Sequence, residues 1–304
     1  MAISMERLRT SFRTPLITEA KMAIQNANPT MSKFHVGAAL YFEKNDGTGN
    51  IVQGWNDEFR GNVRARHAEE SAIAKLPKDG NIKLAVIMGQ NGMPLAPCGG
   101  CREALIGRAD KDAEVLMGEN IVKANWVPLK SLLPNTYDRT YQITQGTEDY
   151  QLFEQALNVM GISYNIYTGR YQSAAILSGK HIFSASLMEE AAYHHLNAID
   201  IALGKVYSTG QVKGISKVLF IDKTAQDAPI FPCGLGRQYL YETYHVCGTD
   251  FEVISANILG KAWATTVSKL LPFPFGPNDL GLTKELEEYR NRIAKFVLGL
   301  PKIQ

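Results

Sequence analysis

The sequence has few cysteines and no long hydrophobic run. Four cysteines in 304 residues are too few for the disulfide scaffold that small secreted proteins rely on. No stretch approaches the run of about 18 uncharged apolar residues that indicates a membrane-spanning helix. The N-terminal residues MAISMER also lack the apolar segment of a secretory signal peptide. These absences lead us to expect a cytoplasmic protein.

The chain also lacks an excess of charge of one sign. Lys and Arg together number 32 and Asp and Glu number 30, which gives a net charge of +2. A protein that follows a phosphate backbone usually carries a basic patch or stripe, and no run of Lys or Arg of that kind is present. Nucleic acid is therefore not an expected partner. Hydrophobic residues make up 45% of the chain, which is enough for full cores in a soluble protein of two domains.

The same order of elements occurs twice along the chain. Each half is expected to hold a helix, two strands, a helix, a strand, a helix and a strand. The expected elements of the first half are 16–26, 34–42, 51–52, 67–76, 84–88, 98–108 and 114–117. Those of the second half are 150–160, 171–177, 181–186, 189–203, 217–221, 233–244 and 251–255. Self-similarity of this kind indicates a duplicated unit, although chance likeness between two α/β domains is the alternative.

Local sequences support the duplication. Pro97-Cys98-Gly99 matches Pro232-Cys233-Gly234, and each half closes on Leu-Leu-Pro, at 132–134 and at 270–272. We therefore predict an α/β fold of two tandem domains, each a mixed sheet flanked by helices. The first would span residues 1–145 and the second 150–304, with a polar linker over 142–149.

The residues most informative about chemistry are His67-Ala68-Glu69 and Pro97-Cys98-Gly99-Gly100-Cys101. Zinc prefers imidazole and thiolate ligands in tetrahedral geometry, and a catalytic zinc keeps one position for water. Pro97 is favoured at a helix start, and residues three apart on the first turn face the same way. Helix N-termini also stabilise thiolates. His67, Cys98 and Cys101 are thus candidate ligands of one Zn²⁺ per chain, with Glu69 close to the metal-bound water.

Either motif alone has other interpretations, because C-x-x-C also occurs in redox and structural zinc sites and H-x-E is common. In this order, however, they form the signature H-x-E…P-C-x-x-C of zinc nucleobase deaminases. Three further segments resemble the cytidine deaminase family: Phe34–Ala39, Gly54–Glu58 and the closing Leu271–Leu280. The chain resembles, in particular, the dimeric two-domain class of that family, whose zinc site is His-Cys-Cys.

The resemblance implies zinc-dependent hydrolytic deamination of cytidine and deoxycytidine to uridine and deoxyuridine, with release of ammonia, in pyrimidine salvage. Glu69 would move protons between water, the ring nitrogen and the departing amine. The resemblance further implies that Ala68 offers backbone groups to the pyrimidine edge and that Phe34 packs on the ring. Asn56 and Glu58 would hold the ribose. Either Tyr137 or Phe275 would reach a neighbouring domain's active site, and the chain would form a homodimer.

The second half is expected to have lost the site. When the halves are aligned through Ala72-Ile73 and Ala198-Ile199, Tyr193 falls at the position of His67 and His195 at that of Glu69. Gly236 replaces Cys101, so that only Cys233 of the three ligands is left. We therefore expect a degenerate, structural domain.

Three alternatives remain open at this level. The substrate could be a modified cytosine nucleoside or a nucleotide, since the basic segment Phe59–Arg66, with Arg60, Arg64 and Arg66, could accommodate an acidic group. It could also be a single-stranded polynucleotide, although this would need a basic, aromatic-lined channel. In the third alternative the chain is a non-catalytic zinc-containing binding protein, which Glu69 disfavours. The helix expected over 284–298 has no predicted role.

Overall fold

The computed structural model describes residues 4–58, 65–191, 195–224 and 226–299, the last four as backbone only. The chain divides into two compact units. Unit 1 comprises Met1–Pro134 together with Phe273–Phe275, and unit 2 comprises Asn135–Pro272 together with Gly276–Gln304. The chain therefore returns to unit 1 for three residues near its C-terminal end.

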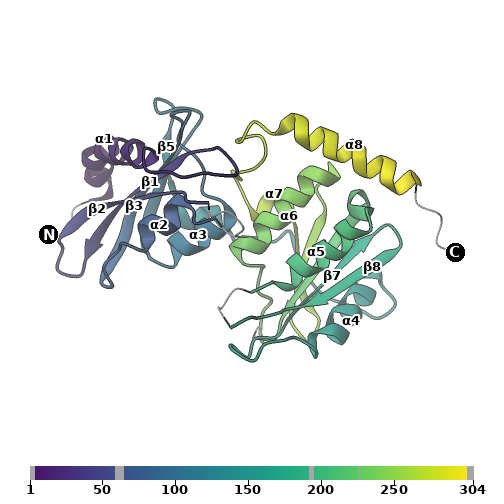
Figure 1. Ribbon diagram of the computed structural model, residues 1–304. Coiled ribbons are helices and arrows are strands. Elements are labelled where there is room, and N and C mark those ends of the chain that lie inside the picture. The colour runs from purple at the N-terminus through teal and green to yellow at the C-terminus, as the bar shows by residue number, and fades with distance from the viewer. Residues whose placement is uncertain (1–3, 59–64, 192–194, 225, 300–304) are drawn as a thin grey trace. The chain divides into compact units, whose positions relative to one another are not determined.

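Unit 1 is a five-stranded mixed sheet with helices on both faces (Figure 1). Its strands lie in the order β2-β1-β3-β4-β5, and only β3 and β4 run parallel. Helix α1 covers one face, whereas α2 and α3 cover the other. The elements are α1 (Met5–Ile24), β1 (Val36–Lys44), β2 (Gly49–Trp55), α2 (Ala68–Ile73), β3 (Gly80–Gly89), α3 (Gly99–Ile106), β4 (Ala109–Met117), β5 (Asn125–Pro128) and the 3₁₀ helix η1 (Leu129–Leu132).

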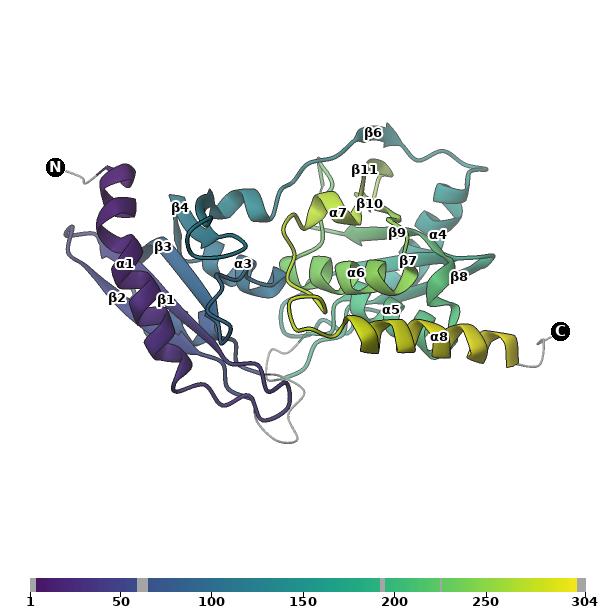
Figure 2. The same cartoon turned by 90° about the horizontal axis from the view of Figure 1, so that it is seen from above.

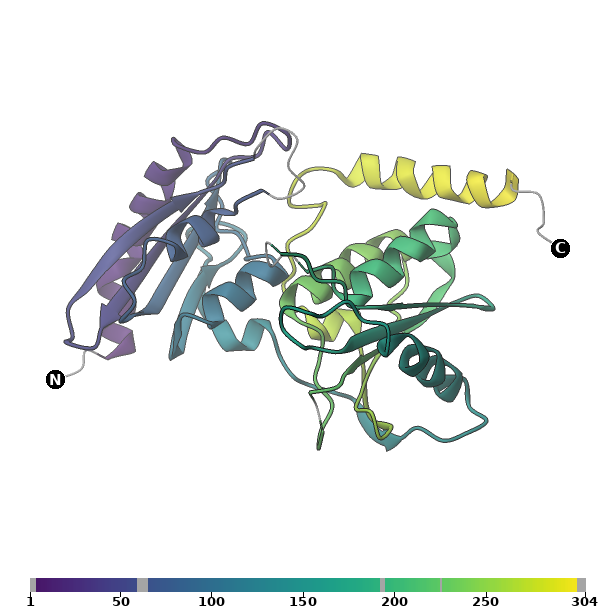
Figure 3. The same cartoon turned by 60° about the horizontal axis from the view of Figure 1, so that its bottom comes forward.

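Unit 2 repeats this arrangement and extends it by one strand (Figure 3). The strand order is β8-β7-β9-β10-β11-β6, with α4 on one face and α5 and α6 on the other. Helix α8 lies against α6 (Figure 2). The elements are β6 (Arg139–Gln142), α4 (Glu148–Met160), β7 (Gln172–Ser178), β8 (His181–Ser186), α5 (Ala198–Ser208), η2 (Gln211–Gly214), β9 (Ile215–Asp222), α6 (Gly234–Cys247), β10 (Glu252–Ala256), β11 (Lys261–Thr266), α7 (Val267–Leu270) and α8 (Thr283–Gly299).

The predicted α/β fold of two mixed sheets flanked by helices is confirmed. The chain enters unit 2 after Pro134, earlier than the expected end of the first domain at 145, because β6 pairs with β11. No helix among the described residues is both long and apolar enough to cross a membrane.

The helix expected over 189–203 instead begins at Ala198. Met188 and Leu196 pair with each other before it, and Asn197 is in an extended conformation. Ala68 and Ala198 are the first residues of α2 and α5, and the alignment through Ala72-Ile73 was therefore wrong by one helical turn. The residue of unit 2 at the position of His67 is Asn197. Tyr193 lies outside the described residues.

Gly54 allows α2 to pack directly on β2. A Cβ atom at this position would lie 2.1 Å from the carbonyl oxygen of Ala68 and 2.3 Å from the backbone nitrogen of Ala72. Both neighbours are backbone atoms of a helix and cannot rotate aside. Since His67 directly precedes Ala68, this close approach also fixes the position of His67.

We expect Gly54→Ala to lower the free energy of unfolding by about 1–3 kcal/mol, the usual cost of overpacking. Gly204→Ala is the matched control, because a Cβ there meets no atom within 4 Å inside α5. Alanine is favoured over glycine in a helix by about 0.5–1 kcal/mol, so this variant should gain stability. Denaturant unfolding of both variants measures the difference, and equal midpoints would contradict the packing argument.

Candidate metal and catalytic site

His67 is held at the N-terminal end of α2. It occupies the N-cap position with φ −75° and ψ 159°, and its backbone N–H donates to Glu70 Oε2 at 2.9 Å. The preceding residue, Arg66, is paired with Asp57 through its backbone. The extended backbone and the hydrogen bond to Glu70 together fix the direction in which the imidazole leaves the chain.

The two thiols lie at the start of α3. Cys98 is the N-cap residue, with φ −65° and ψ 165°, and Cys101 follows in the first turn, where it is buried. The prediction that α3 begins at this C-x-x-C segment is confirmed. The free N–H groups of a first helical turn stabilise negative charge, so this end of α3 is suited to thiolates.

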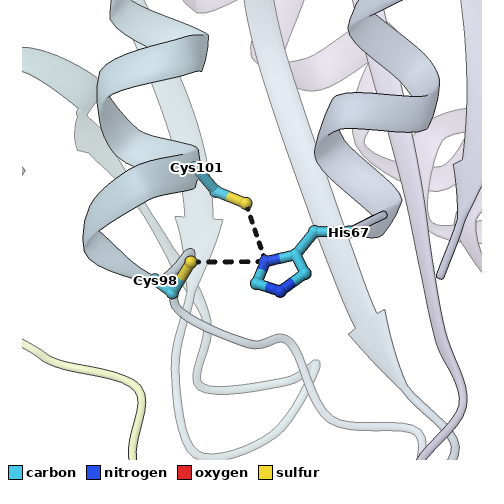
Figure 4. A group of neighbouring side chains, drawn as sticks. All are labelled: His67, Cys98 and Cys101. Atoms are coloured by element: carbon cyan, nitrogen blue, oxygen red, sulfur yellow. Dashed lines mark hydrogen bonds between the residues drawn. The ribbon is translucent and has the colours of Figure 1, made fainter. Parts of the chain in front are cut away.

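His67 Nδ1 faces both sulfurs (Figure 4). It lies 3.2 Å from Cys101 Sγ and 3.4 Å from Cys98 Sγ. In the described part of the chain, these are the three side chains of metal-binding type whose ligand atoms all lie within 4.8 Å of one another. Tetrahedral zinc with bonds of about 2.0–2.1 Å to nitrogen and about 2.3 Å to sulfur separates those atoms by roughly 3.6 Å. The three side chains therefore fit a zinc ion with only small adjustments.

The three side chains shift one another's pKa values in different directions. Hydrogen bonds from Cys101 and His67 lower the pKa of Cys98 to about 4, and the hydrogen bond with Cys98 raises the pKa of His67 to about 9. The hydrogen bond to Cys98, together with burial, raises the pKa of Cys101 well above its usual value. A metal ion would displace protons from these side chains, because it binds deprotonated ligands.

Glu69 lies in the first turn of α2 and is only 5% exposed. Burial, and then the negative charge of Cys98, raise the pKa of Glu69 to about 7. A carboxyl group with this pKa can both accept and donate a proton near neutral pH. The structure therefore places a buried carboxyl group of raised pKa two residues along the chain from His67.

Asn56 is buried at the end of β2, where its side chain bonds to the backbone. Its Oδ1 accepts from Val36 N at 2.8 Å, and its Nδ2 donates to Phe34 O at 2.9 Å. The amide thus fixes the entry into β1, the strand that directly follows Phe34 and His35.

Glu58 is buried as well, and its carboxylate binds a neighbouring loop. Its Oε2 accepts from the backbone N–H groups of Met31 and Ser32 at 2.7 and 2.8 Å. Its Oε1 accepts from Ser32 Oγ at 2.5 Å. Glu58 thus holds the loop that leads into Phe34.

Unit 2 contains the same loop contact. Glu189 Oε2 accepts from the backbone N–H groups of Tyr167 and Thr168 at 3.0 and 3.1 Å, and its Oε1 accepts from Thr168 Oγ1. Glu58 and Glu189 each stand three residues after the end of the second strand of their sheet. The loop contact is therefore a property of the fold and does not depend on the metal ligands.

Phe34 and Phe275 both pack against the core that contains Ala68, on the α2 and α3 face of the first sheet. Phe275 lies in the segment that returns to unit 1. Tyr137 belongs to unit 2, where it stacks on Trp263 with ring centroids 4.8 Å apart. Of the basic segment Phe59–Arg66, residues 59–64 lie outside the described residues, and Arg66 is exposed.

Sequence analysis missed Arg102, which is fully buried. Its Nε donates to Pro97 O and its Nη1 to Leu132 O, each at 2.8 Å, and its Nη2 donates to Phe273 O. Arg102 thereby joins the residue before Cys98, the closing segment of unit 1 and the returning segment that carries Phe275.

Arg237 makes the corresponding contacts in unit 2. It donates to Pro232 O at 2.8 Å, to Leu270 O at 3.2 Å and to Asn135 Oδ1 at 2.9 Å. The sequence does contain a signal for this pair, because both halves read P-C-G-x-x-R.

We expect Arg102→Met to lower the free energy of unfolding by about 3 kcal/mol or more, because it leaves buried carbonyl groups without a donor. Since Pro97 adjoins Cys98, metal content should fall as well. Arg237→Met is the matched control and should destabilise the protein without loss of metal. Thermal unfolding and elemental analysis measure both effects, and an unchanged unfolding midpoint for Arg102→Met would contradict this role.

Comparisons with known proteins agree with the geometry of the site. The family described as "Cytidine and deoxycytidylate deaminase zinc-binding region" matches residues 11–117. A cytidine deaminase of Halalkalibacterium halodurans is 28% identical over 127 residues, which cover 41% of this chain and 93% of that protein. One of Sporosarcina psychrophila is 38% identical over 92 residues, covering 30% and 65%.

Two further similarities have lower identity. A cytidine deaminase of Shewanella frigidimarina is 24% identical over 214 residues, covering 65% of this chain and 68% of that protein. The crystal structure of cytidine deaminase from Burkholderia pseudomallei has a TM-score of 0.39 at 24% identity, covering 44% of this chain and all of that one. Residues 11–117, which match this family, lie within unit 1, and the sequence relatives are cytidine deaminases.

Proposed function

We propose that unit 1 catalyses the zinc-dependent hydrolytic deamination of cytidine and deoxycytidine, in pyrimidine salvage. Water adds to the ring carbon that bears the amino group, the carbon–nitrogen bond breaks, and uridine or deoxyuridine and ammonia are released. The observation that carries the proposal is the convergence of His67, Cys98 and Cys101 beside the buried Glu69. Three protein ligands leave one position for water, which is typical of a catalytic zinc site.

The zinc ion, when bound, supplies a water molecule of lowered pKa, about 7 in known sites. Glu69 takes up a proton from the attacking water and passes it to the ring nitrogen. It then takes up the proton of the added hydroxyl group and delivers it to the departing amino group, which leaves as ammonia. Its burial keeps bulk water from exchanging these protons.

The pyrimidine would lie between Phe34 and Phe275, which pack against the same core as Ala68. Ala68 is the first residue of α2, and the N–H of such a residue has no partner within its own helix. The N–H of Ala68 is therefore available to donate a hydrogen bond to the edge of the base. We place the sugar beside Asn56 and Glu58, whose side chains already hold the backbone around Phe34.

The proposal names a free nucleoside because the net charge of +2 does not supply the basic channel that a polynucleotide needs. The resemblance to the two-domain class further leads us to propose that the enzyme is a homodimer. From the sequence we propose a cytoplasmic location.

Glu69→Gln should separate metal binding from proton transfer. We expect about one zinc per chain and an intact fold, with turnover of cytidine lowered about 10²–10⁴-fold, the usual contribution of a general acid/base group. Cys101→Ser is the counterpart, in which metal and activity should be lost together. Elemental analysis and an absorbance assay test both variants. Retention of more than about a tenth of the activity, or loss of zinc from Glu69→Gln, would exclude this role.

Glu58→Gln tests the sugar contact, because cytosine has no ribose and serves as the reference substrate. Direct contact predicts a loss in kcat/KM on cytidine of about 1–3 kcal/mol, the cost of removing a hydrogen bond to a charged group, and a smaller loss on cytosine. Equal losses on both substrates would mean that Glu58 acts only by holding the loop before Phe34. Glu189→Gln, which changes the same loop contact in unit 2, should leave kcat/KM unchanged.

A further inference from the structure

We propose that unit 2 retains the backbone arrangement of a second metal site at the N-terminal ends of α5 and α6. The substitutions Asn197→His and Gly236→Cys together would restore zinc binding at this site. This inference goes beyond the proposed deamination, since it concerns metal binding in the unit to which no activity is assigned. It depends on three observations: the backbone of the ligand positions, the distance between two side chains and the space at Gly236.

The two ligand-bearing helices begin in the same way in both units. Asn197 is the N-cap of α5 with φ −62° and ψ 154°, where His67 has −75° and 159° in unit 1. Cys233 is the N-cap of α6 with φ −62° and ψ 165°, where Cys98 has −65° and 165°. A side chain placed at 197 or 233 therefore leaves the backbone in nearly the direction of its counterpart.

The side chains at these positions also lie at the same separation. Asn197 Nδ2 is 3.5 Å from Cys233 Sγ, and His67 Nδ1 is 3.4 Å from Cys98 Sγ. The amide nitrogen of Asn197 thus lies about as far from the N-cap sulfur as the candidate ligand nitrogen does in unit 1.

Gly236 has room for the third ligand. A Cβ atom there would have Pro232 Cβ at 3.5 Å, Ile199 Cδ1 at 3.7 Å and Cys233 Sγ at 3.8 Å as its nearest neighbours, all ordinary van der Waals distances. The sulfur of Cys233 is thus one of the three nearest neighbours of an added Cβ atom. A small hollow adjoins this position, lined by Gln172, Asn197, Ile199, Phe220, Pro232, Cys233 and Gly236.

Cys233 also has a structural role in unit 2. Its sulfur accepts hydrogen bonds from Gly236 N and from Asn197 Nδ2, each at 3.5 Å, and it thereby caps α6. Ile199, which stands at the position of Glu69, is 1% exposed and belongs to the core of unit 2. A restored site would therefore bind metal but would have no proton carrier.

The experiment counts zinc per chain in the reduced, zinc-equilibrated protein. We expect one in the unaltered chain and two in Asn197→His/Gly236→Cys, with no gain in deaminase activity. Adding Cys233→Ser to this double variant should return the count to one. In a Cys101→Ser background the double variant should still bind one zinc, so the unit 2 result stands even if unit 1 proves not to bind zinc.

A folded double variant that gains no zinc would overturn the proposal, with folding judged by circular dichroism and by an unchanged unfolding midpoint without metal. Gly236→Cys alone keeps the test decisive if the double variant does not fold. In the Cys101→Ser background, the Gly236→Cys variant has two thiols at the N-terminal end of α6. It should therefore give a cobalt–thiolate absorption band on addition of Co²⁺. The absence of that band in the folded single variant would also overturn the proposal.

Discussion

Two helices must begin side by side on one face of the first sheet for a histidine and two thiols to share a metal. Helix α2 supplies His67 from its N-cap, and α3 supplies Cys98 and Cys101 from its N-cap and first turn. Gly54 lets α2 lie directly on β2, and Arg102 fixes the backbone before α3 through Pro97. The candidate metal ligands, the buried Glu69 and the core around Phe34 and Phe275 all depend on this placement.

Unit 2 shows which parts of this arrangement are independent of the chemistry. It keeps Arg237 and Glu189, whose contacts match those of Arg102 and Glu58, and it keeps the N-cap cysteine of α6. It lacks two of the three residues that would hold a metal, and also the residue that would carry a proton. Arg237, Glu189 and Cys233 each form hydrogen bonds with backbone groups. Asn197, Ile199 and Gly236, in contrast, form acceptable contacts without a metal.

The sequence was sufficient to predict the ligand cluster and the two-sheet fold. His67, Cys98 and Cys101 could be grouped because their chemistry and their spacing are both restrictive. The start of α5 could not be predicted, because the apolar residues before Ala198 suit a helix as well as the extended segment that pairs with Met188. With the helix expected to begin at residue 189, the two halves were aligned one helical turn out of register. Asn197 was therefore not recognised as the counterpart of His67.

Arg102 and the loop contact of Glu58 were missed for another reason. Each side chain is satisfied by main-chain atoms of distant residues, such as Leu132, Phe273 and Met31. The identity of a residue says little about where its carbonyl or amide group will lie. Only the repeated P-C-G-x-x-R segment offered a sign that the arginine has a structural role.

The return of Phe273–Phe275 to unit 1 has a consequence for the order in which the protein is made. Synthesis on the ribosome proceeds from the N-terminus, and domains generally fold as they emerge. The first 134 residues emerge well before Phe273, yet Arg102 needs the carbonyl of Phe273 and the core of unit 1 includes Phe275. The unit that is translated first is thus completed only after most of the second has left the ribosome, and any premature stop before Phe273 leaves both units incomplete.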